Sequence, residues 1–193
     1  MRLISTLFAV LAVSACGGAP VAEPASYDLA AVAVAWKPAR PLVRDVGVIA
    51  PSWLGGTAIA YRLLYADPLR RQAYAESRWA APPAELIERA LNRQTGVGGG
   101  CRLRLDLDDL EQVFDTPQTS RILLDVRASL VAPNRDAVLA RKAFALMQPA
   151  PSADARGGGA AATTAVQELG GELAAWLAQL VRDTPAIAER CKG

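Results

Sequence analysis

The chain contains no histidine among its 193 residues. This absence excludes Ser-His-Asp and Cys-His nucleophile systems, and it removes the commonest ligand of transition metals. Lysine is scarce as well, because Lys37, Lys142 and Lys192 are the only three and are scattered along the chain. No compact pair of carboxylates stands in a loop suited to general acid and base catalysis. We therefore expect a protein that is not an enzyme and that carries neither a metal site nor a dissociable cofactor.

Charge of one sign is not concentrated anywhere in the sequence. The formal net charge is +2, and the densest basic run, Arg70 and Arg71 near Arg78, is short. We therefore expect no nucleic acid among the partners. The glycine triplets at residues 98–100 and 157–159 do not match the glycine patterns of nucleotide-binding loops, and we assign both to loops. With 52% hydrophobic and 21% charged residues, the chain suits one globular domain.

The amino terminus has the order of features found in a secretion signal. Arg2 gives a positive start, and residues 3–13 are apolar but too few to span a bilayer as a helix. Val13-Ser14-Ala15-Cys16 follows and resembles a lipobox, in which small residues precede the cleavage site and the cysteine takes a diacylglycerol thioether. We expect residues 1–15 to be a lipoprotein signal peptide and Cys16 to be the acylated first residue. The alternatives are an ordinary signal peptide with a chance cysteine, or a buried amino-terminal helix.

The covalent lipid on Cys16 would tether the domain to a membrane. Gly17, rather than aspartate, follows the cysteine. By resemblance to enterobacterial sorting, this favours the outer membrane, with the domain facing the periplasm. Residues 16–35 begin with a segment rich in Gly, Ala and Pro that lacks apolar periodicity. We assign residues 16–35 to a lipidated flexible tether, followed by a single domain over residues 36–193.

Two cysteines remain once Cys16 is acylated. Cys101 and Cys191 are an even pair in an oxidising periplasm, so we expect a disulfide between them. This bond would join the carboxyl-terminal tail to the start of a strand. Two unpaired thiols are the alternative, and a metal site made of two thiols without histidine is less favoured.

Alternation of apolar and polar residues predicts a sheet. Residues 43–50 and 59–65 are rich in β-formers, residues 71–79 alternate more weakly, and Pro82-Pro83 opens a helix with one apolar face. The period of two is clearest near residues 103–108 and 122–130, and a third run covers residues 138–146. These last three runs predict a long antiparallel meander.

A final helix is predicted by apolar residues at helical spacing before Pro185. They are Val166, Leu169, Leu173, Trp176, Leu177 and Leu180. We expect this helix to cover the sheet, and the alternative is that Trp176 faces a partner or lipid. Order and periodicity together predict one α/β domain built on a mixed β-sheet.

Two stretches and the order of the later elements carry a family resemblance. The first stretch is Ile59-Ala60-Tyr61-Arg62, and the second contains Tyr74-Ala75-Glu76-Ser77-Arg78-Trp79-Ala80-Ala81-Pro82-Pro83. With the later strands and a closing helix at Trp176-Leu177, they resemble the ABC-type transport auxiliary lipoproteins, which accompany Mce-domain lipid transporters. The resemblance implies a central sheet with helices packed on both faces. It also implies a role beside a transporter that moves lipids between the inner and outer membranes.

The same resemblance implies an Mce-domain protein as partner and leaves a homo-oligomer open. Arg78 and Trp79, followed by two prolines, make a rigid corner where a planar cation and a large ring could bind a partner. The alternative is that Trp79 belongs to the core and Arg78 pairs locally. Two rival functions are a carrier that holds a lipid in its own pocket, and a structural outer-membrane lipoprotein of envelope assembly.

Overall fold

The computed structural model describes residues 23–29, 42–93, 98–133 and 137–192. Within these ranges, seven strands form one sheet of order β1-β4-β3-β5-β6-β7, with β2 also paired to β5. The elements are β1 (Ala25–Tyr27), β2 (Val43–Ile49), η1 (Ser52–Leu54), β3 (Ala58–Leu63), β4 (Asp67–Trp79), α1 (Pro83–Asn92), β5 (Cys101–Thr116), β6 (Thr119–Val131), β7 (Val138–Pro149), α2 (Ala155–Asp183) and α3 (Ala186–Arg190). The predicted signal peptide, residues 1–15, and Cys16 lie outside the described residues.

The predicted antiparallel meander is present as β5, β6 and β7. Leu103, Leu105 and Leu107 of β5 are buried, in line with the alternation of the sequence. A shift of register between Leu107 and Asp109 then brings Leu110 to the buried face. This β-bulge lets one long strand keep its apolar side on the core although its sequence changes phase.

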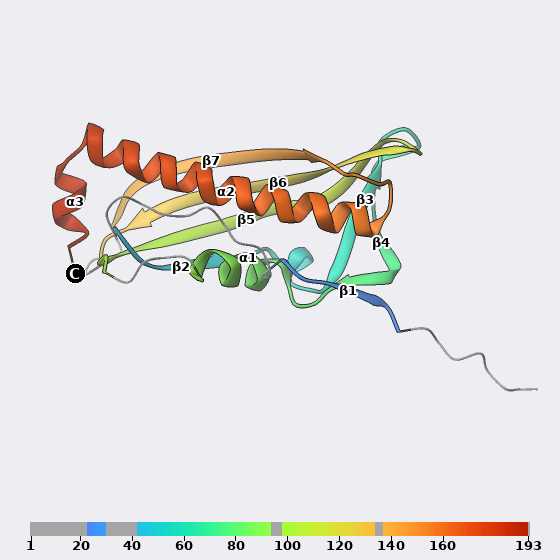
Figure 1. Ribbon diagram of the computed structural model, residues 1–193, viewed down its shortest axis with the longest axis horizontal. Helices are drawn as coiled ribbons and strands as arrows, with labels where there is room; N and C mark the ends of the chain where they lie inside the picture. The colour runs from blue at the N-terminus through green and yellow to red at the C-terminus, as the bar shows by residue number, and fades with distance from the viewer. Residues whose placement is uncertain (1–22, 30–41, 94–97, 134–136, 193) are drawn as a thin grey trace, which may run out of the picture.

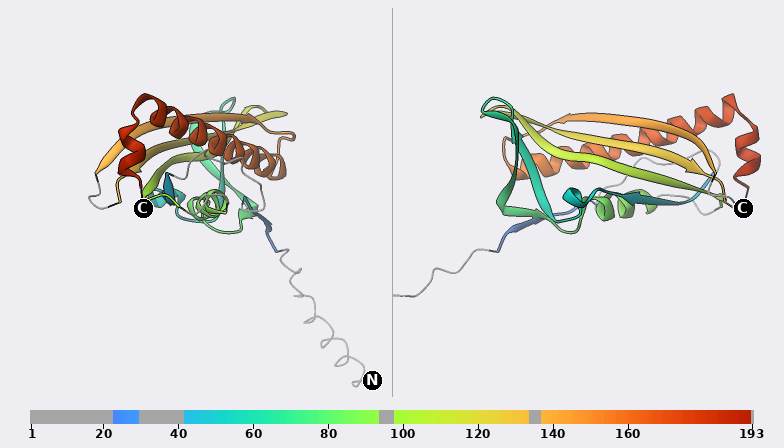
Figure 2. Two further views of the ribbon diagram at one scale, coloured as in Figure 1. Left: turned by 60° about the vertical axis from the view of Figure 1, so that its left-hand side comes forward. Right: turned by 180° about the vertical axis from the view of Figure 1, so that it is seen from behind.

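β5 is the central strand, and it has two parallel neighbours along one edge. β2 pairs with residues 101–106 of β5, and β3 pairs with residues 112–114. β4 runs antiparallel to β3, and β1 adds to β4 in parallel. The sheet is therefore mixed, as predicted. Figure 2, in the view from behind, shows β3 and β4 turned away from the long strands at one end of the molecule.

Helices α1 and α2 lie on the same side of the sheet (Figure 1). α2 packs on β6 and β7, α1 packs on β2, and the two helices also contact each other. Leu169, Leu173 and Leu177 of α2 are fully buried, and Trp176 meets Phe144 of β7 edge to face with 6.1 Å between ring centroids. Helices on both faces are not confirmed. Along the described part of the meander, the other face carries many charged side chains and is not covered by a helix.

The second glycine triplet lies inside α2, so its assignment to a loop is wrong. The carboxylate of Asp154 caps the helix by accepting a hydrogen bond of 2.7 Å from the amide of Gly157. Glycine lowers helix propensity by about 1 kcal/mol relative to alanine. Glycine is nevertheless required here, because this turn lies so close to the sheet that a Cβ on Gly158 would be 2.2 Å from Oε1 of Gln112. Tertiary packing thus overrides local propensity.

The folded domain begins earlier than predicted. Ala25–Tyr27, within the segment assigned to the flexible tether, form β1 beside residues 77–79 of β4. Leu29 is fully buried. The boundary at residue 36 is therefore wrong for these residues. A strand of three residues is too short to leave a periodic signal in the sequence.

Candidate functional site

The described residues bring together no group of three or more histidine, cysteine, aspartate or glutamate side chains placed to hold a metal ion. In the same ranges, no helix combines the length and the hydropathy needed to cross a bilayer. Seven features of the molecule, from the Arg78-Trp79 corner to the end of the β3–β4 hairpin, are candidates for a functional role.

The Arg78-Trp79 corner divides into a core residue and a surface residue. Trp79 is only 2% exposed, and its amide donates to the carbonyl of Thr57 at 2.7 Å. Arg78 remains 46% exposed and makes an ion pair of 3.5 Å with Glu23. Trp79 thus packs in the core and Arg78 pairs locally, which is the alternative to a corner where both side chains bind a partner. Of the two, only Arg78 presents its side chain to a partner in this conformation.

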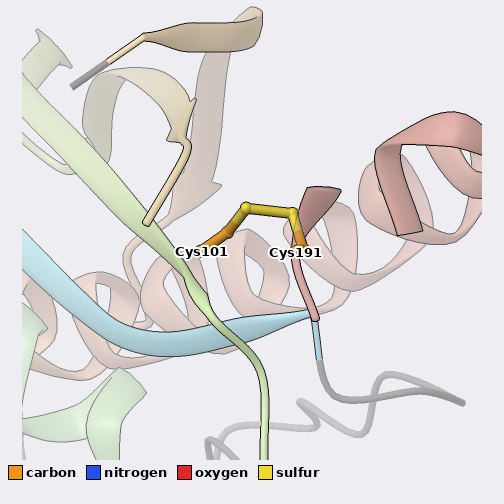
Figure 3. Close-up of a disulfide and its surroundings, with 2 residues drawn as sticks. All are labelled: Cys101 and Cys191. Atoms are coloured by element: carbon orange, nitrogen blue, oxygen red, sulfur yellow. A yellow bond between two sulfur atoms is a disulfide. The ribbon is translucent and has the colours of Figure 1, made fainter. Parts of the chain in front are cut away.

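The predicted disulfide joins Cys101 to Cys191, with Cα atoms 4.8 Å apart (Figure 3). Both residues are buried. The carboxyl-terminal segment is held there by a second contact, because the amide of Gly100 donates to the carbonyl of Cys191 at 2.7 Å. The bond connects the end of α3 to the first residue of β5, so it lies at one end of the long strands.

A buried polar network fixes the opposite end of β5. Gln112 is fully buried, its Oε1 accepts from the Tyr74 hydroxyl at 2.9 Å, and its Nε2 donates to Oγ of Ser120 at 2.8 Å. Nε2 also donates to the carbonyl of Asp154 at 3.1 Å, which ties β5 to the start of α2. Burial, together with the charge of Asp154, raises the pKa of Tyr74, so the hydroxyl stays a neutral donor.

Ion pairs connect β5 to the β3–β4 hairpin near this end, on the side of the sheet opposite to α2. Nε of Arg62 on β3 lies 3.1 Å from the carboxylate of Glu111, which is only 5% exposed. Nη2 of Arg71 on β4 lies 2.9 Å from the carboxylate of Asp109. The carboxylates both belong to β5, so these pairs bind the β3–β4 hairpin to the central strand across the sheet.

Further along β5, on the uncovered face of the sheet, the carboxylates of β5 and β6 have different environments. A two-pronged hydrogen bond of 2.6 and 2.7 Å from Arg127 lowers the pKa of Asp108. Burial and the neighbouring carboxylates of Asp109 and Asp108 raise the pKa of Asp125. This face of the sheet therefore carries both positive and negative side chains rather than charges of one sign.

Three arginines surround a hollow in this uncovered face. The hollow has a volume of about 420 Å³, and its lining includes Arg104, Arg127 and Arg141 together with Asp106 and Ser129. The strand register places Arg104 of β5 and Arg141 of β7 on either side of Ser129 of β6. Their guanidinium groups are exposed and can donate hydrogen bonds to a carboxylate or phosphate. We refer to these three side chains as the arginine hollow.

The β3–β4 turn and the first residues of β4 expose large apolar side chains. Leu64 is 37% exposed, Tyr65 is 48% exposed and Leu69 is 89% exposed. Turn residues are ordinarily polar or small. We refer to these three residues as the apolar tip.

Comparison with known proteins identifies the fold. No family model matches the chain, and no curated protein matches its sequence. A crystal structure of a Xanthomonas campestris protein, attributed to the family-model DUF330, matches with a TM-score of 0.67 at 19% sequence identity, over 83% of this chain and 98% of that chain. A second crystal structure, of an uncharacterized protein, matches with a TM-score of 0.57 at 12% identity, over 81% of this chain and 99% of that one.

These similarities show a shared fold over nearly the whole length of both solved chains. The first of these solved chains is the one attributed to DUF330. At such low identity, no site residue can be transferred from them. Any function must be argued from this chain.

The arginine hollow and the apolar tip were both missed by sequence reasoning. Alternation correctly placed Arg104 and Arg127 on the polar side of their strands, but it does not reveal that no helix of the described residues covers this side. The signal for the apolar tip was the Asp67-Pro68 pair, which favours a nearby turn and here begins β4 directly after the turn at residues 64–66.

Proposed function

We propose that this chain is a non-enzymatic auxiliary lipoprotein of an Mce-type ABC transporter that moves lipids between the inner and outer membranes. The lipid on Cys16 anchors it to the outer membrane, and the domain faces the periplasm. The resemblance of the Tyr74 to Pro83 stretch to auxiliary lipoproteins supports this proposal, and the lipobox supports it independently.

The observation that carries the proposal is the uncovered, charged sheet face of a domain that starts close to its anchor. The first strand, β1, begins at Ala25, nine positions after Cys16. The domain is thus held near a membrane. Its meander leaves one face free for contacts instead of burying it under a helix.

This face is suited to docking a protein. Ion pairs such as Arg127 with Asp108 hold its charged groups in place before any partner arrives. In the arginine hollow, Arg104 and Arg141 offer exposed guanidinium groups on adjacent parts of the surface. Complementary charge steers association and fixes the orientation of partners. We propose that the arginine hollow receives acidic side chains of the Mce-domain protein.

The test is crosslinking of membranes that contain the full-length, lipidated protein, followed by affinity purification and mass spectrometry. The proposal predicts recovery of an Mce-domain protein. It also predicts that Arg141→Glu lowers the recovery, because the reversed charge repels an acidic partner. Arg156→Glu, the same change on an exposed residue of α2, serves as the matched control and retains recovery.

Two results would overturn the proposal. Recovery of only envelope-assembly machinery would favour a structural lipoprotein. Lipid that copurifies with the domain in the absence of any transporter protein would favour a carrier. Equal recovery with Arg141→Glu and with Arg156→Glu would remove the arginine hollow from the docking surface while leaving the transporter role in place.

A further inference from the structure

We infer that the apolar tip, formed by Leu64, Tyr65 and Leu69, inserts into the surface of the same membrane that holds the lipid anchor. This inference rests on the acylation of Cys16 in the proposed function but not on the identity of the transporter. It assigns a second membrane contact to the protein and thereby an orientation to the domain.

The apolar tip makes little contribution to the core. Leu69 is 89% exposed, and Leu64 and Tyr65 keep a third to a half of their surface in contact with solvent. Large exposed apolar side chains that are grouped at the end of a hairpin mark an interaction site more often than isolated ones do. The aromatic ring of Tyr65 with its hydroxyl also suits the boundary between lipid headgroups and acyl chains.

The turn is held rigidly in the shape that exposes these side chains. The amide of Ala66 donates to the carbonyl of Leu63 at 3.1 Å, and the amide of Leu69 donates to the carboxylate of Asp67 at 3.1 Å. Nη1 of Arg62 donates to the carbonyl of Pro68 at 3.0 Å. A preorganised tip loses little conformational entropy when it enters a membrane surface.

The ion-pair network on β5 extends this rigidity into the sheet. Arg62, which holds the Pro68 carbonyl, is itself paired with the nearly buried Glu111. The amide of Leu64 donates to the carbonyl of Phe114 at 3.0 Å. The apolar tip is therefore fixed to the central strand at the end of β5 that lies farthest from the disulfide.

The N-terminal strand lies at this same end of the molecule. A Cβ on Gly158 of α2 would meet Gln112 of β5, and a Cβ on the next residue, Gly159, would lie 3.1 Å from the ring of Tyr27 in β1. Figure 1 shows the β3–β4 turn and the start of β1 toward the same end of the long axis but on opposite sides of it, with α3 at the other end. The start of β1 and the apolar tip therefore face the same direction along the long axis, separated by the length of β4.

The length of the tether keeps that end close to the bilayer. Seven residue steps separate Cys16 from Glu23, and such a segment spans at most about 25 Å even when fully extended. Arg70, which follows Leu69, is exposed and suited to contact a lipid phosphate. The position, the polarity and the charge of the apolar tip therefore all suit contact with a lipid surface.

An environment-sensitive fluorophore tests the inference in the full-length, acylated protein. The dye is attached to Leu69→Cys, and the protein is reconstituted in vesicles of phosphatidylethanolamine and phosphatidylglycerol. Val138→Cys is the matched control, because Val138 is also apolar and exposed but pairs with Val131 near the disulfide end. We expect a blue-shifted emission at position 69 that nitroxide-labelled lipids quench, and solvent-like, unquenched emission at position 138.

Equal, solvent-like emission at both positions would overturn the inference. A blue shift at position 69 without quenching by labelled lipids would also overturn it, because protein rather than lipid would then cover the apolar tip. Mass spectrometry of the acylated amino terminus in the same sample separates these outcomes from failure of the proposed anchor. The crosslinking result with the Mce-domain protein is independent of all of them.

Discussion

Substitution of Gly158 by alanine tests how α2 is seated on the sheet. The new Cβ would lie 2.2 Å from Oε1 of Gln112, which is closer than any real contact allows. The Gln112 side chain cannot simply move aside, because it is fully buried and bonded to Tyr74, Ser120 and the Asp154 carbonyl. Gly171 provides the matched control on the same helix, since a Cβ there meets no atom within 4 Å.

The two substitutions should change stability in opposite directions. Replacing a helical glycine with alanine stabilises by about 1 kcal/mol in either case. At Gly158 this gain is opposed by overpacking, at about 1–3 kcal/mol. The disrupted hydrogen bonds of Gln112 add about 1–3 kcal/mol. We therefore expect Gly158→Ala to destabilise by about 2 kcal/mol and Gly171→Ala to stabilise by up to about 1 kcal/mol.

The assay is urea unfolding followed by circular dichroism, on chains that start at residue 16 and carry Cys16→Ser. A difference of about 3 kcal/mol between the two variants corresponds to roughly 6–12 °C in Tm for a domain of this size. If both variants were stabilised equally, the close seating of the glycine turn on Gln112 would be refuted.

Three further substitutions test the core, the disulfide and the helix cap. Trp79→Ala should lower the free energy of unfolding by about 3–5 kcal/mol in urea titrations, as expected for a buried tryptophan, whereas a loss below about 1 kcal/mol would indicate a surface role. Breaking the Cys101–Cys191 bond by Cys191→Ser should cost about 2–5 kcal/mol, and an unfolding midpoint that does not respond to reductant in the parent chain would contradict this. The pKa of Asp154 is lowered by the Gly157 amide and the Ser152 hydroxyl. The contribution of the Asp154 carboxylate to the free energy of unfolding is therefore present above the unfolded-state pKa of about 4 and is lost as the pH falls through the folded pKa. Asp154→Ala should accordingly make the free energy of unfolding less dependent on pH in this acidic range.

Sequence patterns predicted the meander because its strands are long and amphipathic. Leu103, Leu105 and Leu107 alternate with charged residues over enough positions to define both the strand and its buried face. The Cys101–Cys191 bond was predicted in another way, from the expected periplasmic compartment and the even number of remaining cysteines. Long-range features such as the two parallel neighbours of β5 leave no comparable local signal.

Residues whose role depends on tertiary contacts were the ones that sequence reasoning missed. The triplet at residues 157–159 has the composition of a loop, and only its contacts with Gln112 and Tyr27 explain a helix there. Trp79 was ambiguous for the same reason, since the sequence does not show whether a tryptophan beside an arginine faces the core. The arginine hollow lies on a sheet face that no helix within the described ranges covers, and no alternating pattern encodes this.

The most direct test of the central claim is site-specific photo-crosslinking in cells that express the full-length, lipidated protein. One photoreactive residue replaces Arg141 in the arginine hollow, and another replaces Ala175 on the exposed side of α2. The account predicts a crosslink to an Mce-domain protein from position 141 and none from position 175. A crosslink from position 175 alone, or none to an Mce-domain protein from either position, would contradict the proposal that the uncovered sheet face docks the transporter.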